Sequence, residues 1–182
     1  ESILEKSGKE TPAHEIAKRA RSAQFIEIRQ GDARGLGHAV LCGQIGTDND
    51  RVAVLLPDDL YLGERPALGD LIALSDRYPD QGVIGLLKVP PEQSRKYGMV
   101  GGSWHDDHMI IERLVEKPEP ADAPSQYAIT GRYVLPSQVF DLLRHQETGA
   151  LGEIQLTDAL QGLANDRGML GVIPQAKRFD AG

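Results

Sequence analysis

Cysteine is almost absent from the chain, which has Cys42 alone among its 182 residues. A single cysteine excludes an intrachain disulfide framework and fits a reducing cytoplasm. No apolar run approaches the roughly 20 residues that cross a bilayer. The N-terminal ESILEKSGKE also lacks the apolar stretch of a signal peptide. The sequence therefore predicts a cytoplasmic protein without a membrane span.

Positive charge is also scarce, because the formal net charge is -7 and the pI is near 5.2. This balance argues against a general surface for nucleic acid or for an anionic membrane. It leaves open a local basic pocket for a phosphate group. Hydrophobic residues make up 40% and charged residues 26% of the chain, which is ordinary for a soluble globular domain.

Internal repeats, low-complexity tracts and interdomain linkers are all missing, so we predict one domain over residues 1–182. The chain has no initiating methionine and stops at Phe-Asp-Ala-Gly without a capping element. We therefore expect this domain to be incomplete at both ends.

Apolar patterns predict strands that alternate with helices. The alternation in AQFIEI favours a half-buried strand over residues 23–28, and the apolar run over residues 51–56 is typical of a strand buried on both faces. Helical spacing follows over residues 66–78, and another apolar strand is expected over residues 82–89. Shorter strands come after residue 97. The pattern predicts an α/β sheet that is parallel in its first part.

Two adjacent carboxylates, Asp58 and Asp59, end the stretch AVLLPDD directly after an apolar strand. Ligands in open α/β sheets bind outside the carboxyl ends of the strands. Mg²⁺ takes one or two carboxylates together with substrate phosphates and waters. One aspartate would then hold metal while the other faces solvent or caps a turn. A plain strand-to-turn transition explains the same residues equally well.

Glycines 31, 35 and 37 stand in the loop GDARGLGHAV, before an apparent helix. Glycines allow close approach of a ligand to the backbone, and helix N-termini favour anions. The loop matches neither the dinucleotide fingerprint nor a Walker-type phosphate loop, so a flexible loop is the alternative interpretation. His38 alone is more typical of a helix start than of a catalyst.

Glu116 and Lys117 lie in VEKPEP, after an apolar strand and before a proline. Lysine donates to phosphates, and glutamate accepts from sugar hydroxyls. A solvated charge pair at a strand end is the alternative. His105 and His108 flank two aspartates and favour a polar turn, since no histidine or cysteine cluster has the spacing of a zinc site.

Several stretches in order closely resemble bacterial UTP–glucose-1-phosphate uridylyltransferases, also called UDP-glucose pyrophosphorylases, of the sugar nucleotidyltransferase family. They are RQGDARGLGHAVLC, AVLLPDD, YGMV, VEKP, ITGRYVL, GEIQLTDA and KRFDAG. The resemblance runs over essentially the whole chain. It implies a Rossmann-like mixed, mainly parallel sheet flanked by helices, with the first βα unit missing from this chain. It also implies a homo-oligomer, either a dimer or a tetramer.

The family's reaction joins UTP and glucose-1-phosphate to give UDP-glucose and pyrophosphate, with Mg²⁺. Carried over by motif, the resemblance implies that Asp58 is the first metal carboxylate and Asp180 in RFDAG the second. Gln30 and Gly35 match positions that contact the uracil ring. Gly98 in YGMV matches a glycine that lies against the sugar.

The resemblance also implies that Glu116 bonds the glucose hydroxyls and that Lys117 holds the sugar phosphate. GEIQLTDA would complete the sugar pocket, without an individual contact assigned.

This sequence departs from the family pattern in two places. It contains no GxGTRxxPxTK segment, which grips the triphosphate in the family, and it has RFDAG where RFDCG is usual. We therefore expect the 182 residues alone to be inactive. Two alternatives stay open: a related enzyme that uses dTTP or CTP with another sugar phosphate, and a non-catalytic module that binds a nucleotide sugar without turnover.

Overall fold

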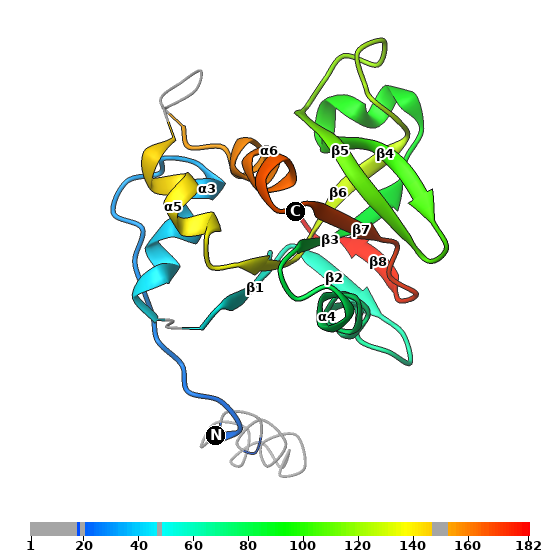
Figure 1. The fold of residues 1–182 in the computed structure, drawn as a ribbon. Helices are drawn as coiled ribbons and strands as arrows, with labels where there is room; N and C mark the ends of the chain where they lie inside the picture. Colours follow the sequence, from blue (N-terminus) through cyan, green and yellow to red (C-terminus); the bar gives the residue numbers. More distant parts are fainter. Residues whose placement is uncertain (1–17, 19–20, 47–48, 147–152) are drawn as a thin grey trace.

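The computed structural model describes residues 18, 21–46, 49–146 and 153–182, which form a mixed α/β fold (Figure 1). The predicted α/β class is confirmed. The elements in chain order are α3 (Leu36–Cys42), the 3-10 helix η1 (Gly43–Gly46), β1 (Arg51–Leu55), β2 (Asp59–Leu62), α4 (Ala67–Arg77), β3 (Gly82–Lys88), the 3-10 helix η2 (Pro91–Lys96), β4 (Gly98–His105), β5 (His108–Glu116), β6 (Tyr127–Pro136), α5 (Val139–His145), α6 (Leu156–Asp166), β7 (Met169–Val172) and β8 (Lys177–Asp180).

The main sheet has six strands in the order β1-β6-β3-β7-β5-β4. Strands β3 and β7 run parallel, whereas the other described ladders of this sheet are antiparallel. The expectation of a mainly parallel sheet is therefore wrong for the described residues. The reason is that β6 inserts between β1 and β3 in the opposite direction, and that β4 and β5 form a hairpin instead of a crossover.

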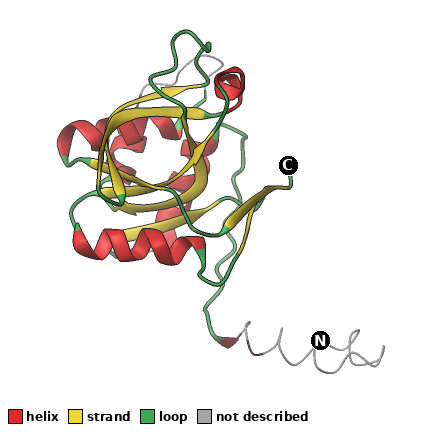
Figure 2. Cartoon of the chain, turned by 90° about the vertical axis from the view of Figure 1, so that its right-hand side faces the viewer, coloured by secondary structure: helices red, strands yellow, loops and turns green. Residues whose placement is uncertain are grey.

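Helices cover both faces of this sheet, as Figures 1 and 2 show. Helices α3, α5 and α6 lie over one face, and their apolar side chains join those of the strands, including Ile84 of β3, in one core cluster. Helix α4 covers the other face, where Leu71 and Leu74 pack against Val83. Neighbouring residues of β3 point to opposite faces, so both faces of the strand must be apolar. This explains the unbroken apolar run in GVIGLLK.

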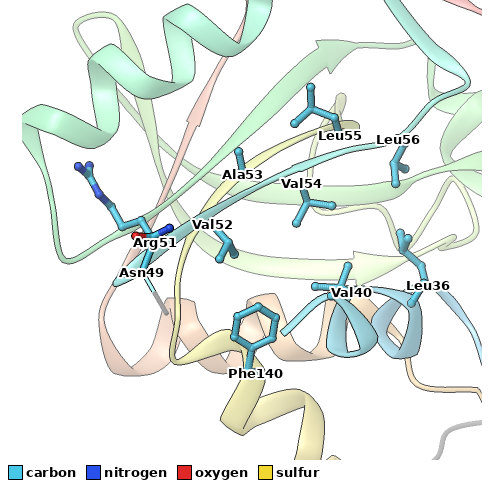
Figure 3. Close-up of a pocket in the computed structure, with 12 residues that line it drawn as sticks. Leu36, Val40, Asn49, Arg51, Val52, Ala53, Val54, Leu55, Leu56 and Phe140 are labelled. Carbon is cyan, nitrogen blue, oxygen red and sulfur yellow. The ribbon is translucent and has the colours of Figure 1, made fainter. Parts of the chain in front are cut away.

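Strand β1 is different, because it lies at the edge of the sheet and pairs with β6 on one side. The prediction that it is buried on both faces is wrong: Ala53 and Leu55 are exposed. Beside it lies an apolar cavity of about 520 Å³, also lined by Val40 of α3 and Phe140 of α5 (Figure 3). An edge strand leaves one row of backbone N–H and C=O groups without ladder partners.

Residues 23–28 do not form the predicted strand, and the side chain of Phe25 is 77% exposed. Alternating apolar residues stabilise a strand only when a neighbouring strand pairs with it and a core covers one face. Neither condition is met for this stretch within the part of the chain that the structure describes.

A second, two-stranded sheet joins β2 to β8 in antiparallel register, with Asp59 opposite Asp180. Neither strand was predicted from the sequence. This ribbon leads to the C-terminal residue in Figure 2. It brings the PDD turn and the RFDAG stretch side by side.

Among the described residues, no helix combines the length and apolar character that crossing a membrane requires.

Candidate functional site

A pocket of about 430 Å³ gathers polar residues from the ends of several strands. It contains the predicted residues Asp58, Gly98, Glu116, Lys117 and Asp180. The other polar residues that line it are Asp59, Lys96, Tyr97, Thr130, Tyr133, Glu153, Gln155, Thr157 and Arg178. Residues separated by more than a hundred positions in the chain therefore meet in one concave site. The β1 cavity, in contrast, is lined mainly by apolar side chains.

Glu116 stands at the end of β5, directly opposite Gly98 of β4. Its Oε2 accepts a hydrogen bond of 2.5 Å from Thr157 Oγ1, at the start of α6. A β-carbon at position 98 would lie 2.9 Å from Ile129 Cδ1 and 3.1 Å from Glu116 Oε2. A side chain at position 98 would therefore require small shifts of Ile129 and of the Glu116 carboxylate, and glycine lets both keep their places. Thr157 lies in the GEIQLTDA motif, but its hydrogen bond to Glu116 was not predicted from the sequence.

Lys117 has a backbone φ of 43°, in the left-handed region that non-glycine residues rarely adopt. Its N–H donates to the Tyr97 carbonyl at 3.0 Å, which ties the end of β5 to the residue before β4. The side chain is 60% exposed, and its Nζ lies 3.8 Å from Glu116 Oε1. Backbone strain of this kind collects at functional sites. Here it accompanies an exposed ammonium group that lines the pocket and pairs with Glu116.

Asp58 is exposed and adjoins Asp180, because the Ala181 N–H donates to the Asp58 carbonyl at 2.9 Å. The Asp180 side chain is about half exposed, and one of its oxygens lies 3.2 Å from Arg178 Nη2. Two accessible carboxylates thus share one wall of the pocket. The predicted meeting of Asp58 and Asp180 is found in the structure.

Asp59 has a different environment, since it is 2% exposed. Its carboxylate accepts hydrogen bonds from Arg178 Nε and from the Gly131 N–H of β6. The Asp59 carbonyl also accepts from Arg132. The interpretation that the second aspartate faces solvent or caps a turn is wrong. It is a buried ion-pair partner that joins three elements.

Arg178 stays a cation in this setting. Partial burial opposes its charge, but contacts with the Tyr97 hydroxyl and with Asp59 raise the pKa of its guanidinium above the ordinary value. A buried carboxylate without such a partner would be strongly unfavourable. Arg178 lies in the KRFDAG motif, but its ion pair with Asp59 was not predicted from the sequence.

The carboxylates of Asp58 and Asp180 fit a magnesium site. Mg²⁺ uses one or two protein carboxylates and takes its remaining ligands from waters and substrate phosphates. The described residues contain no group of three or more side chains that would hold a metal by themselves. An open two-carboxylate wall is therefore the arrangement that suits a metal shared with a phosphorylated substrate.

Gln30 and Gly35 lie outside the lining of this pocket, but Gly35 precedes Leu36, which lines it, and Gln30 Nε2 donates to the Gly35 carbonyl. Gly35 has a φ of 90°, and a β-carbon there would lie 2.8 Å from the Ile154 carbonyl. The two chain segments are joined by hydrogen bonds from Ile154 N–H to Arg34 O and from Gly37 N–H to Ile154 O, at 2.8 and 2.9 Å. Glycine is thus required by the close approach of two backbones, and this approach brings the loop to the rim of the pocket.

The described residues thus combine a mixed sheet with a pocket that has acidic and basic strand ends in its lining and a glycine loop at its rim. The family model described as nucleotidyl transferase matches residues 3–178, and the chain belongs to this family.

Within the family, the chain is similar to UTP–glucose-1-phosphate uridylyltransferases. One from Bacillus subtilis is 39% identical over 180 residues, which cover 98% of this chain and 60% of that protein. One from Pseudomonas aeruginosa is 40% identical over 161 residues, which cover 87% of this chain and 57% of that protein. The chain therefore spans about 60% of the length of the curated relatives it matches.

Solved structures agree with this assignment. A UDP-glucose pyrophosphorylase complexed with UDP-glucose matches with a TM-score of 0.90 and 32% identity, over 96% of this chain and 67% of that one. A UTP-bound UGPase from Acinetobacter baumannii matches with a TM-score of 0.83 and 32% identity, over 99% of this chain and 63% of that one.

Proposed function

We propose that the protein carrying this chain is a UTP–glucose-1-phosphate uridylyltransferase, which makes UDP-glucose and pyrophosphate. The observation that carries the proposal is the meeting of Glu116 and Lys117 with Asp58 and Asp180 in one pocket of a nucleotidyl transferase fold. A sugar phosphate needs hydroxyl and phosphate partners, and a nucleoside triphosphate needs charge neutralisation. The pocket offers groups for both.

The proposed reaction is an in-line displacement. An oxygen of the glucose-1-phosphate phosphate group attacks the α-phosphorus of UTP and forms the new P–O bond. The bond from the α-phosphorus to the bridging oxygen breaks, and pyrophosphate leaves with that electron pair. No covalent nucleophile of the protein is needed, so catalysis depends on positioning and on stabilising negative charge.

Glu116 and Lys117 would hold the attacking substrate. The carboxylate accepts hydrogen bonds from glucose hydroxyls, and Thr157 keeps it in place through its own hydrogen bond. The exposed Lys117 ammonium holds the sugar phosphate as a point charge. Gly98 leaves room for the sugar ring beside Glu116.

Asp58 and Asp180 would hold Mg²⁺, which neutralises phosphate charge when it is bound. Arg178 and Asp59 keep this wall of the pocket in place through their buried ion pair. Gln30 and Gly35 would contact the uracil ring, since Gly35 directly precedes Leu36, which lines the pocket.

Assay of pyrophosphate release tests the proposal directly. The protein that carries this chain should release pyrophosphate only when UTP and glucose-1-phosphate are both present with Mg²⁺. Replacing UTP by dTTP or CTP separates the uridylyl assignment from a related nucleotidyltransferase. Binding of UDP-glucose without pyrophosphate release would instead support the non-catalytic module and overturn the enzyme proposal.

The 182-residue chain is expected to be inactive by itself, because it contains no GxGTR-type segment for the triphosphate. Robust turnover by the isolated chain would contradict that expectation. The homo-oligomer and the cytoplasmic location stay predictions, which size-exclusion chromatography with light scattering and cell fractionation would test.

A further inference from the structure

Gln30 has an amide whose orientation is fixed by its surroundings. Its Nε2 lies 3.2 Å from the Gly35 carbonyl oxygen and 2.9 Å from His38 Nδ1. A carbonyl oxygen can only accept a hydrogen bond, so the nitrogen of the amide must face it. The Gly35 carbonyl identifies which end of the Gln30 amide is the nitrogen, and the shorter contact with His38 is the second one that holds the amide in this orientation.

The second hydrogen of the Gln30 amide points to His38 Nδ1, and this contact selects one tautomer of the neutral imidazole. His38 Nδ1 must accept, so in the neutral ring the proton lies on Nε2. That nitrogen is 3.9 Å from Cys42 Sγ, one turn further along α3. The hydrogen-bond roles of these groups are therefore all set. The Gln30 amide donates to both the imidazole and the Gly35 carbonyl, and the imidazole Nε2–H faces the thiol sulfur.

These hydrogen bonds engage the nitrogen of the Gln30 amide. The amide oxygen, Oε1, bonds neither Gly35 nor His38. It is a pure acceptor. The N3 atom of uracil carries a hydrogen and donates, whereas N3 of cytosine is an acceptor. An amide whose two hydrogens are engaged meets uracil N3–H favourably and has no free N–H for cytosine N3.

We propose that His38 is a positioning residue that sets base selectivity by holding the Gln30 amide with its oxygen presented as an acceptor. The inference rests on the proposed function, in which Gln30 contacts the base.

The helix that carries His38 is held firmly enough to position the imidazole. Helix α3 is anchored at Gly37, where the N–H donates to Ile154 O at 2.9 Å and a β-carbon would lie only 2.6 Å from the same oxygen. Val40 of the same helix is buried in the main core. The imidazole therefore projects from a fixed helix, while Gln30 lies on an irregular segment that needs an external constraint.

His38→Ala in the protein that carries this chain tests the inference. Loss of the hydrogen bond should raise KM for UTP roughly three- to tenfold. The preference for UTP over CTP in kcat/KM should fall by a similar factor, because the freed amide can turn and donate. KM for glucose-1-phosphate should stay unchanged.

A rescue variant and a control sharpen the test. His38→Asn keeps an acceptor on the γ-carbon, near the place of Nδ1, and should restore most of the preference for UTP. His105→Ala removes an exposed histidine at the end of β4, outside the pocket, and should change neither KM.

The outcomes separate the two levels of the proposal. Absence of pyrophosphate release from the unmodified protein with UTP and glucose-1-phosphate overturns the proposed function itself. If the unmodified protein is active, an unchanged UTP preference in His38→Ala overturns the role of His38 alone. An equal rise of both KM values, or no rescue by asparagine, shows a merely structural histidine and also overturns it.

Discussion

The two sides of the pocket hold their polar residues in different ways. On the proposed sugar side, Glu116 ends the nine-residue strand β5, which pairs with β4 on one edge and β7 on the other. On the proposed nucleotide side, Gln30 lies on an irregular segment and is held by hydrogen bonds to Gly35 and His38. Position on the first side is fixed by backbone ladders, and on the second by side-chain contacts.

This difference has a common physical origin. Strands β3 to β7 find partners and a core within the described chain, whereas β1 is an edge strand and residues 23–28 have no ladder. A strand without a neighbour gains neither backbone hydrogen bonds nor burial, and cannot offset the entropy of ordering. The packed side should therefore be sensitive to core substitutions, and the open side should not.

Paired substitutions in the two regions give the largest expected contrast. Leu86→Ala on β3 removes a side chain that is 1% exposed and should lower the free energy of unfolding by about 2–5 kcal/mol. Phe25→Ala removes a larger side chain that is 77% exposed and should change it by less than about 0.5 kcal/mol. Urea unfolding followed by circular dichroism measures both. Similar losses from the two variants would contradict the contrast drawn here.

Asp58→Asn tests the proposed metal site on the wall of the pocket that Asp58 and Asp180 share. Removing one proposed metal carboxylate should lower kcat by about 100-fold or more, since metal stabilisation of developing charge is worth several kcal/mol. The exposed side chain makes no buried ion pair, so the unfolding free energy should stay within about 0.5 kcal/mol of the unmodified value.

The control for this variant is Asp80→Asn, an exposed aspartate outside the pocket. It should leave kcat unchanged. In a titration with Mg²⁺, only Asp58→Asn should need a higher Mg²⁺ concentration for half-maximal activity. Unchanged turnover in that variant would mean that the wrong carboxylate has been assigned.

Lys117→Ala probes the sugar side alone. A charged hydrogen bond to the sugar phosphate is worth about 1.5–3 kcal/mol, so KM for glucose-1-phosphate should rise roughly tenfold or more. KM for UTP should remain as it was, because the nucleotide side is held by other residues. Lys88→Ala, an exposed lysine at the end of β3, is the matched control. Equal losses for both substrates would contradict the division of the pocket into two sides.

A surface ion pair away from both sides gives the smallest expected effect. Arg77 and His108 donate to Asp107 and lower the pKa of its carboxyl below the ordinary value. A carboxyl with a depressed folded-state pKa stabilises the protein above its unfolded pKa of about 3.9 and loses that contribution as pH falls below it. The group is exposed, so the contribution is small.

Asp107→Asn should therefore lower Tm slightly at pH 7, and the difference from the unmodified protein should narrow at pH 2.5. Thermal scans at the two pH values measure it. A difference that grows on acidification would show that the sign of the effect is wrong.

Much of the site and of the core could be predicted from the sequence, because both lie in recognisable motifs or apolar runs. Asp58, Glu116, Lys117 and Asp180 were all predicted for one site, and the structure brings them together. The core strands were predictable where apolar runs were continuous, as over residues 82–89. The core strands follow from the local residues, whereas the site residues followed from the resemblance of several motifs in order to a known family.

Other features depend on partners that local patterns do not reveal. Asp59 resembled an ordinary turn residue, since its cation is Arg178, 119 positions away. Strands β2 and β8 are four residues each and lack strong alternation, so only their pairing defines them. Residues 23–28 carried a clear strand pattern, and the missing ladder overrode it.

The ribbon of β2 and β8 also bears on the order in which the site is assembled during synthesis. Asp58 and Asp59 are synthesised long before Arg178, and closing a loop of this length is entropically costly until the intervening core has formed. The carboxylate wall can therefore form only after β8 has been synthesised and has paired with β2. A nascent chain that has already built β3 to β6 would still have an unfinished metal site, which would delay productive nucleotide use until β8 is in place.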